Sequence, residues 1–381
     1  MLNQGNQNNT ILHDTYVQPL LTRVLETQRF GACRRPIIVH ELKSKDGFNY
    51  DCIDLVVPYA DINLKWTILF DSEFPELGPD FIFNDDFLLN PDANSLIENV
   101  PSLNTWNYCD SNSLLLVLKE LLTYYKKKQI ELIKNRCQRR LSFEYEELIK
   151  IVKEENVEVI IMNNGLKSSE VKFFIRLTID FSRIPQKHKH HLQSDAVLLL
   201  VTFSGSDYSN VVPALQLTKT IENILGSQET LSIPPYPSQD GLLIEYVPLI
   251  ENFLKGKVEA LISNCKRKRD FISSLLIILR GSIIEYDALE FNQATFLVEK
   301  KDFHFFIHFR IPSRFPREKP EVVMESAYHM DRSGKMITHT ISKYPHNYQA
   351  ESISMVQTIL KHIEEKEVEP FQQMCTQKNR F

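Results

Sequence analysis

Three histidines stand close together at His188, His190 and His191, and imidazole nitrogens are common ligands of zinc. In one class of zinc protease whose signature includes a His-x-His pair, that signature also has a glutamate upstream, and a serine and an aspartate at set spacing downstream. Here Asp195 follows His190 by only five residues. We therefore interpret the segment as a solvated loop and expect no metal ion and no other cofactor.

Cysteine thiols are the second group that could do chemistry, because a thiolate attacks carbonyl carbons and forms thioesters. The chain has six cysteines, which are scattered and include no Cys-x-x-Cys pair. With no signal peptide before them, this pattern predicts reduced thiols in a protein of the cytoplasm or nucleus. The candidate nucleophile among them is Cys109, which follows Trp106 and precedes Ser113, a predicted helix N-cap.

The elements that would position these groups are marked by a phrase that occurs twice, at residues 74–83 and 315–324. Both copies begin with Phe-Pro, carry a second proline four residues after the first, and continue into an apolar run. Alternating apolar residues typical of a strand precede each copy. Because proline lacks an N–H and pushes the preceding residue into the extended region, each phrase separates two strands.

A helix and a run of strands surround the first copy. The predicted helix covers residues 17–29, and the predicted strands cover 37–42, 51–57, 64–70 and the apolar run after the phrase. Helical spacing resumes at Ser113, and neither glycine nor proline occurs between Pro101 and Gly165. One long helix, or two nearly end to end, is therefore predicted from Ser113 to about residue 156.

The same order of elements recurs twice more. In the middle of the chain we predict four strands and then a helix, without the phrase, over residues 157–162, 171–181, 196–203, 211–217 and 246–264. The last part begins with an apolar helix stopped by Gly281 and continues with strands and a closing helix, over residues 271–279, 283–287, 293–299, 303–309 and 352–366. We interpret the basic run 266–269 as a helix end that complements the helix dipole, and the polar tail from Pro370 as loosely held.

The strand, Phe-Pro turn and second strand together resemble the ubiquitin-conjugating-enzyme fold and its non-catalytic relatives, the ubiquitin-conjugating variant (UEV) and RWD domains. The resemblance implies an α+β chain of tandem UEV/RWD-like domains, each a four-stranded antiparallel meander flanked by helices. The predicted division is a disordered leader, a UEV-like domain, a degenerate UEV/RWD-like middle domain, a second UEV-like domain and a tail, over residues 1–10, 11–141, 142–270, 271–369 and 370–381.

The residues that a conjugating enzyme uses for catalysis do not fit this chain. Such an enzyme carries a His-Pro-Asn turn after the fourth strand, then a cysteine, with a tryptophan beyond it. The first unit has Asn90-Pro91-Asp92 instead, and Cys109 lies on the wrong side of Trp106. The last unit has no cysteine between Cys265 and Cys375. We interpret Cys109 as a small half-buried residue beside a helix start and expect no catalytic residue; an active conjugating enzyme that uses Cys109 is the alternative.

Several stretches resemble the BRE (brain and reproductive organ-expressed) family more specifically, in colinear order over nearly the whole chain, with the middle weakest. They are Val57-Pro58-Tyr59-Ala60, residues 64–70, residues 74–83, Leu114-Leu115-Leu116-Val117 with Lys119-Glu120-Leu121, Arg267-Lys268-Arg269, residues 284–288 and Phe315-Pro316-Arg317. The resemblance implies a non-catalytic scaffold subunit of the BRISC deubiquitinase assembly, which trims non-degradative ubiquitin chains. A sister nuclear assembly serves DNA-damage signalling, so both cytoplasm and nucleus are implied.

The partners implied by the resemblance are a zinc-dependent JAMM deubiquitinase, an inactive MPN-domain subunit and a von Willebrand A-like adaptor, with ubiquitin itself as a further candidate. A stand-alone ubiquitin or peptide receptor is the remaining alternative. Tyr328, Tyr344 and Pro345, which follow the second phrase, are candidate partner-binding residues, because exposed aromatic groups are good peptide anchors. The net charge of −5 and the lack of a long apolar run argue against nucleic acid and membrane partners.

Overall fold

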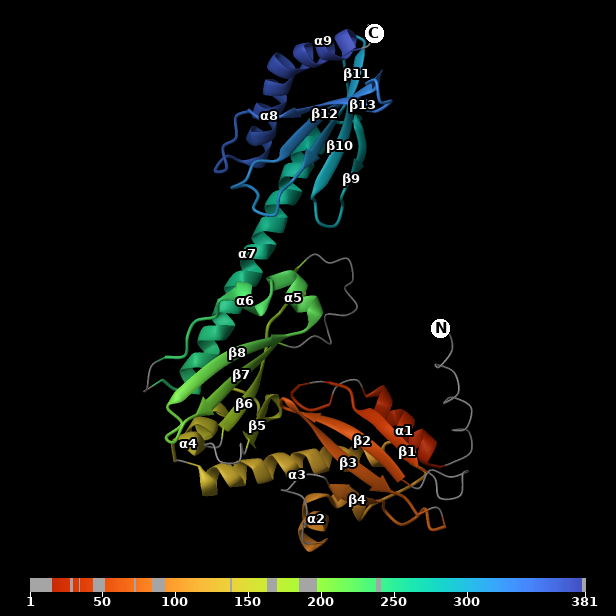
Figure 1. The fold of residues 1–381 in the computed structure, drawn as a ribbon, viewed down its shortest axis with the longest axis vertical. Coiled ribbons are helices and arrows are strands. Elements are labelled where there is room, and N and C mark those ends of the chain that lie inside the picture. Colours follow the sequence, from red (N-terminus) through yellow and green to blue (C-terminus); the bar gives the residue numbers. More distant parts are fainter. Residues whose placement is uncertain are drawn as a thin grey trace. The chain divides into compact units, whose positions relative to one another are not determined.

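The computed structural model describes residues 16–27, 30–33, 35–43, 52–71, 73–83, 93–137, 139–162, 170–184, 197–237 and 241–378. These residues form an α+β chain with three antiparallel sheets, which confirms the predicted fold class at that level (Figure 1). No helix among them is long and apolar enough to span a membrane. The predicted leader, the histidine-rich loop around His188 and the segment Asn90-Pro91-Asp92 lie outside the described residues.

The described residues divide into two compact units. The first contains the first two sheets and the start of the long helix α7, up to Phe253; the second contains that helix from Leu254 and all elements after it. The three-domain division with boundaries after residues 141 and 270 stays a prediction.

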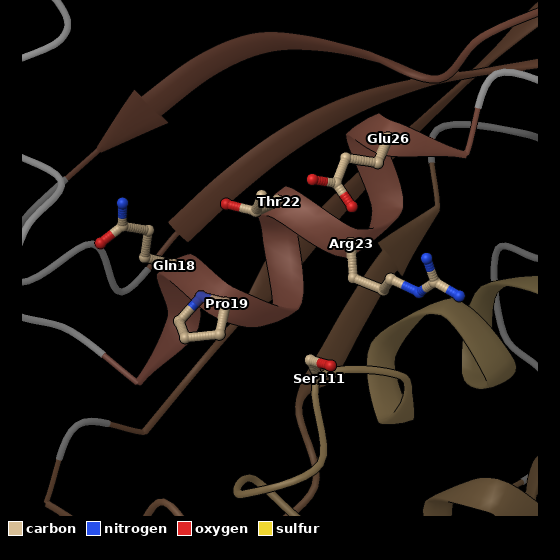
Figure 2. Close-up of a pocket in the computed structure, with 6 residues that line it drawn as sticks. All are labelled: Gln18, Pro19, Thr22, Arg23, Glu26 and Ser111. Atoms are coloured by element: carbon tan, nitrogen blue, oxygen red, sulfur yellow. The ribbon is translucent and has the colours of Figure 1, made fainter.

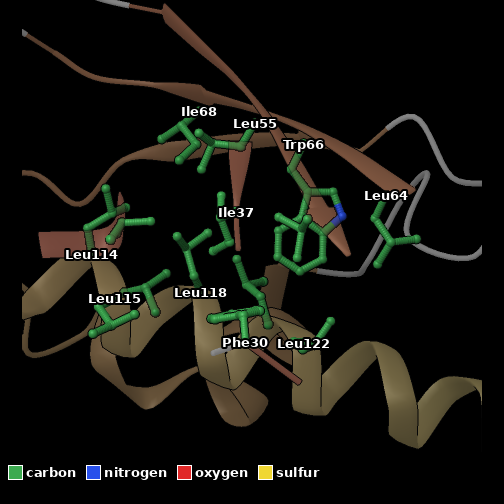
Figure 3. Packing of buried hydrophobic residues seen from close by; sticks show 14 of the residues in the cluster. Phe30, Ile37, Leu55, Leu64, Trp66, Ile68, Leu114, Leu115, Leu118 and Leu122 are labelled. Carbon is green, nitrogen blue, oxygen red and sulfur yellow. The ribbon is translucent and has the colours of Figure 1, made fainter. Parts of the chain in front are cut away.

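The first sheet is a four-stranded meander in the order β1-β2-β3-β4. Its elements are α1 (Val17–Glu26), β1 (Ile38–Lys43), β2 (Cys52–Tyr59), β3 (Ile62–Leu69), β4 (Asp80–Phe83), α2 (Ala93–Asn99), η1 (Pro101–Leu103) and α3 (Ser113–Arg136). Alternate residues of β2 and β3 are buried, as the predicted period of two requires. Figure 3 shows Leu55, Trp66 and Ile68 of these strands facing Leu118 and Leu122 of α3.

The second sheet belongs to the same unit and is also a meander, in the order β5-β6-β7-β8. Its elements are α4 (Arg139–Leu148), η2 (Glu154–Asn156), β5 (Val157–Met162), β6 (Glu170–Leu177), β7 (Val197–Ser204), β8 (Asn210–Leu217), α5 (Lys219–Leu225) and α6 (Gln228–Leu231). Ile160 and Phe174 of this sheet are part of the same buried cluster as the core of the first sheet. The two sheets therefore share a hydrophobic core.

The long helix α7 (Leu243–Ile278) corrects one prediction. Two helices were expected, over 246–264 and 271–279, with the basic run 266–269 at the end of the first. The helix is continuous instead, so the basic run lies inside it and does not complement a helix end. Lys268 is buried, its Nζ donates to Asn292 Oδ1 at 2.7 Å, and burial lowers its pKa.

The third sheet has five strands, in the order β13-β12-β11-β10-β9, where four were predicted. Its elements are β9 (Ile283–Tyr286), β10 (Gln293–Lys300), β11 (Phe303–Arg310), β12 (Glu321–Met330), β13 (Met336–Ile341), α8 (Ser352–His362), the π-helical turn η3 (Ile363–Glu367) and α9 (Val368–Lys378). The tail expected to be loosely held from Pro370 is helical, and its Phe371 and Cys375 are buried in the core of the second unit. His304 and His308 lie opposite the buried residues of β11, as predicted.

Candidate partner-binding surfaces

The predicted partner-binding residue Tyr344 is half-buried and stabilises the turn of the second phrase. Its hydroxyl donates to the Pro320 carbonyl oxygen, and Lys319 Nζ lies 5.0 Å from the centre of its ring. Burial raises the pKa of Tyr344. Because the ring packs against the core, it is less available to a partner than an exposed anchor would be. A partner-binding role for Tyr344 stays a prediction.

Pro345 lines a pocket of about 280 Å³ between the chain that precedes α8 and α8 itself. His346, Asn347 and Met355 of α8 line the same pocket. Tyr328 contacts a different element: it is 54% exposed on β12, and its hydroxyl forms a hydrogen bond with His304 Nδ1 on β11. The structure therefore places Pro345 at a concave surface and Tyr328 on the sheet.

The two Phe-Pro phrases are held by the same kind of hydrogen bond, which the sequence alone does not indicate. The indole N–H of Trp106 donates to the Pro75 carbonyl oxygen at 3.1 Å in the first unit. In the second unit His346 Nε2 lies 2.6 Å from the Pro316 carbonyl oxygen and donates a hydrogen bond to it. In each case a side chain that comes after the phrase in the sequence donates a ring N–H to the carbonyl oxygen of the first proline of the phrase.

The neighbourhood of Cys109 corrects two predictions. Cys109 is exposed, whereas a half-buried position was expected; its backbone N–H donates to Asn107 Oδ1 at 3.0 Å. A hydrogen bond with Cys109 raises the pKa of Tyr108. The N-cap of α3 is Asn112, one residue before the predicted cap, and Ser113 instead donates its hydroxyl to the Asn107 carbonyl oxygen at 2.8 Å.

A buried carboxylate joins the two sheets of the first unit. Glu158 on β5 is 3% exposed and accepts hydrogen bonds from Ala32 N at 2.7 Å and from Ala60 N at 2.6 Å. Beside it, the Tyr59 hydroxyl donates to the Val159 carbonyl oxygen at 2.8 Å. Burial raises the pKa of Glu158, and the two amide hydrogen bonds act in the opposite direction. The carboxylate thus connects the segment before β1 and the turn between β2 and β3 to the neighbouring sheet.

Gly31 leaves the room that this carboxylate needs. Its φ is +64°, in the region that favours glycine, and a Cβ at Gly31 would lie 2.4 Å from Glu158 Oε1. Any larger residue there would displace the carboxylate. The sequence pattern does not indicate this contact, because Glu158 stands in an apolar strand where alternation alone predicts an outward side chain.

A second buried carboxylate, Glu144 of α4, holds the start of α7. Glu144 is fully buried and accepts a hydrogen bond from Leu243 N at 2.7 Å, and Arg140 Nε lies 3.9 Å away. Amide groups in the first turn of a helix lack intrahelical acceptors, so a carboxylate at this end is favourable. The Tyr236 hydroxyl also donates to it, at 3.4 Å.

A polar pocket of about 430 Å³ lies beside α1 in the first unit. Figure 2 shows Gln18, Thr22, Arg23 and Glu26 of the helix around it, with Ser111 opposite. Arg23 Nε donates to Asn112 Oδ1 at 2.8 Å, which fixes the arginine against the loop before α3. Among the described residues that line it, the pocket offers a cationic group, Arg23, and an anionic one, Glu26, but no nucleophile hydrogen-bonded to a base.

Comparison with known proteins decides the family. The model of the family described as brain and reproductive organ-expressed protein (BRE) matches residues 10–330. The chain belongs to the BRE family. A relative in Danio rerio named BRISC and BRCA1-A complex member 2 is 33% identical over 347 residues, which are 87% of this chain and 87% of the relative. A relative of the same name in Branchiostoma floridae is 32% identical over 346 residues, 87% of this chain and 88% of its own length.

The BRE match confirms the resemblance read from the sequence and also locates it. Both Phe-Pro phrases and the buried carboxylates Glu144 and Glu158 lie within the matched residues. Tyr344, Pro345 and the helices α8 and α9 follow residue 330, beyond the residues matched by the BRE model.

Proposed function

We propose that this chain is a non-catalytic scaffold subunit of a BRISC-type deubiquitinase complex. The observation that carries the proposal is membership of the BRE family, with two relatives of near-equal length that are named as members of the BRISC and BRCA1-A complexes. In this proposal the catalytic subunit is a JAMM zinc metalloprotease that cleaves non-degradative ubiquitin chains. The chain binds this subunit, an inactive MPN-domain subunit and a von Willebrand A-like adaptor, in the cytoplasm and in the nucleus.

The proposal includes a UEV/RWD-like fold for the first and last sheets. Each is an antiparallel meander in which a Phe-Pro phrase connects two neighbouring strands, β3 to β4 in the first and β11 to β12 in the last. In each phrase a ring nitrogen donates to the carbonyl oxygen of the first proline. This shared detail supports a duplicated unit. The middle sheet has the meander without the phrase, in keeping with a degenerate third copy.

Exposed apolar residues around the first phrase supply a surface that suits a scaffold. Phe74 is 51% exposed and Leu77 is 57% exposed, whereas Phe315, the counterpart of Phe74, is buried. Exposed apolar residues that lie together on a folded protein commonly mark an interaction site. We therefore assign this part of the first unit to the contact with a partner subunit.

Affinity purification of the tagged chain from native lysate, followed by mass spectrometry, tests the proposal. We expect a zinc metalloprotease and its MPN-domain partner to be recovered in amounts comparable to the chain. The double variant Phe74→Ser/Leu77→Ser should lose at least one partner while its unfolding midpoint stays unchanged, since both side chains are exposed. Leu289→Ser, an exposed leucine of the second unit, is the matched control. Recovery of the chain alone would contradict the scaffold role.

A thioester assay tests the alternative of a conjugating enzyme that uses the exposed Cys109. With activating enzyme, ATP and ubiquitin, we expect no adduct that reducing agent removes, because no His-Pro-Asn turn precedes the thiol in the required order. Cys109→Ser should behave like the wild-type chain. A thiol-sensitive adduct that disappears in Cys109→Ser would establish the alternative.

A further inference from the structure

The edge of the five-stranded sheet is covered over only part of its length. β10 runs from Gln293 to Lys300, but β9 pairs with it only from Ala294 to Phe296. One further hydrogen bond on this edge joins Leu297 N to the carbonyl oxygen of Ser282, the residue before β9, at 2.7 Å. After Leu297, no strand among the described residues pairs with the edge of β10 that faces away from β11. Residues 298–300 therefore form an open strand edge.

The period of the strand identifies which backbone groups this edge presents. Gln293 O accepts from Asp287 N and Leu297 N donates to Ser282 O, so the odd-numbered residues of β10 turn their backbone groups toward β9. Glu299 continues that series, and its N–H and C=O face the open edge. Glu299 is exposed, and a Cβ on Gly281, in the turn before β9, would meet no atom within 4 Å.

An apolar pocket of about 250 Å³ lies on the core side of the same edge; we call it the edge pocket. It is lined by the apolar residues Leu279, Val298, Phe305, Ile307, Leu360, Ile363 and Val368, with the charged residues Glu299, Lys300 and Glu364 at its rim. Cavities of about 150 Å³ with such a lining accept a benzene ring, so one large apolar side chain fits here. The π-helical turn η3 forms one wall, and turns of this kind are frequent at functional sites.

The charges at the rim favour a basic partner. The side chains of Glu299 and Glu364 are 59% and 68% exposed. Lys300 is the one cation among the lining residues, and its Nζ is held by the carbonyl oxygen and the carboxylate of Glu364, each at 3.1 Å. His304 Nε2 lies 3.4 Å from Glu299, on the outer face of the sheet. The rim thus carries an excess of negative charge.

We propose that the open edge at Glu299 and the edge pocket bind an extended segment of a partner polypeptide that carries a large apolar residue next to a lysine or arginine. The segment adds to β10 as a short strand through the backbone of Glu299. Because side chains alternate along a strand, its apolar residue enters the edge pocket on the core face, and the adjacent basic residue reaches the Glu299 carboxylate on the outer face. This surface goes beyond the proposed scaffold function and does not depend on the identity of the complex.

Selection from a phage-displayed library of random short peptides on the full-length chain provides the probe. We expect the enriched peptides to share an aromatic or large aliphatic residue directly beside a basic one. Replacing that apolar residue by serine in the peptide should weaken binding at least about tenfold, as measured by fluorescence anisotropy. Enrichment of acidic peptides, or no shared pattern, would overturn the proposal.

The variant Glu299→Pro separates edge pairing from general surface binding. Proline is tolerated at an edge strand where the N–H faces outward, so the melting temperature should change little, whereas the loss of the donor should weaken peptide binding about tenfold. Glu299→Lys should also weaken peptide binding, because it reverses the charge that meets the basic residue of the peptide. Glu321→Gln, at the end of β12 that pairs with β11, is the control. If Glu299→Pro bound the peptide with unchanged affinity, the peptide would not pair with the strand edge and the proposal would be refuted. A dimer of the chain that Glu299→Pro abolishes would assign the edge to a second copy and refute the partner assignment.

Discussion

Replacing Glu158 with alanine is expected to lower the free energy of unfolding of the first unit by about 2–6 kcal/mol, because two buried N–H donors lose their acceptor at about 1–3 kcal/mol each. The donors are Ala32 N and Ala60 N, which lie on different segments from β5. Both tryptophans of the chain, Trp66 and Trp106, belong to this unit. Urea unfolding followed by tryptophan fluorescence therefore reports on it selectively.

The matched control is Glu155→Ala, an exposed glutamate in the turn just before β5, which should change the midpoint little. Glu158→Gln keeps the shape and one acceptor but points an amide N–H at a backbone N–H, so we expect an intermediate loss. If Glu158→Ala unfolds at the same urea concentration as Glu155→Ala, the carboxylate does not hold the two sheets together.

The pH dependence of the Glu158 contribution follows from the direction of its pKa. Burial raises the pKa above the ordinary value of 4.5, so the folded chain binds a proton more tightly than the unfolded chain. The contribution of this group to stability is therefore largest below the unfolded pKa and declines as the pH rises through the folded pKa. The stability difference between the wild-type chain and Glu158→Gln should be larger near the unfolded pKa than at neutral pH. If the difference instead grew with pH, the hydrogen bonds from Ala32 N and Ala60 N would stabilise the charged carboxylate more than burial destabilises it.

Replacing Phe371 with alanine is the second change with a large expected effect, about 3–5 kcal/mol for a buried phenylalanine. Phe371 is 1% exposed, and its ring lies 5.8 Å from that of Phe303 and 6.3 Å from that of Phe305, measured between centres. The loss should release α9 from the sheet. Hydrogen exchange of the peptides that cover α8, α9 and β11 should accelerate by about 100-fold or more at the most protected amides.

Gln373→Ala, an exposed substitution on the same helix, is the control for Phe371→Ala and should leave exchange unchanged. The wild-type chain itself provides a decisive result. If the α9 amides already exchange at the rate of an unprotected peptide, the last helix is not docked, and the tail is as loosely held as its polar sequence suggests.

The strands could be predicted because their alternation is local. Leu64, Trp66 and Ile68 alternate with polar or smaller residues, and the same side chains are buried on β3. The phrase Phe-Pro also acts locally, through the fixed φ of proline and the missing N–H. For these elements the neighbouring residues along the chain contain the necessary information.

The burial of charged residues could not be predicted in the same way. Glu158 finds its donors at Ala32 and Ala60, roughly 100 or more positions away in sequence, and Lys268 finds Asn292 in another element. Which polar side chain is covered depends on how sheets and helices pack, and single-sequence periodicity does not contain that packing. The alternation around Glu158 and the interpretation of the basic run 266–269 as a helix end therefore did not indicate that Glu158 and Lys268 are buried.

Two wrong predictions, the division of α7 into two helices and the loosely held tail, concern segments whose own residues indicate the correct structure. The interval between Gly256 and Gly281 contains neither glycine nor proline, which permits one continuous helix, but the basic run 266–269 suggested a helix end. In the tail, Val368, Phe371 and Cys375 have the three- and four-residue spacing of a helix face. The surrounding polar residues obscured that pattern.

The burial of Cys375 allows the motion of the last helix to be timed by chemistry. Cys375 is fully buried on α9, whereas Cys109 is exposed, so the same molecule contains an accessible thiol and a protected one. An alkylating reagent can reach Cys375 only when α9 separates from the sheet, and the rate of modification then measures how often the helix opens. Since Val368 at the start of α9 lines the edge pocket, an occupied pocket would slow this reaction while Cys109 reacts at its usual rate.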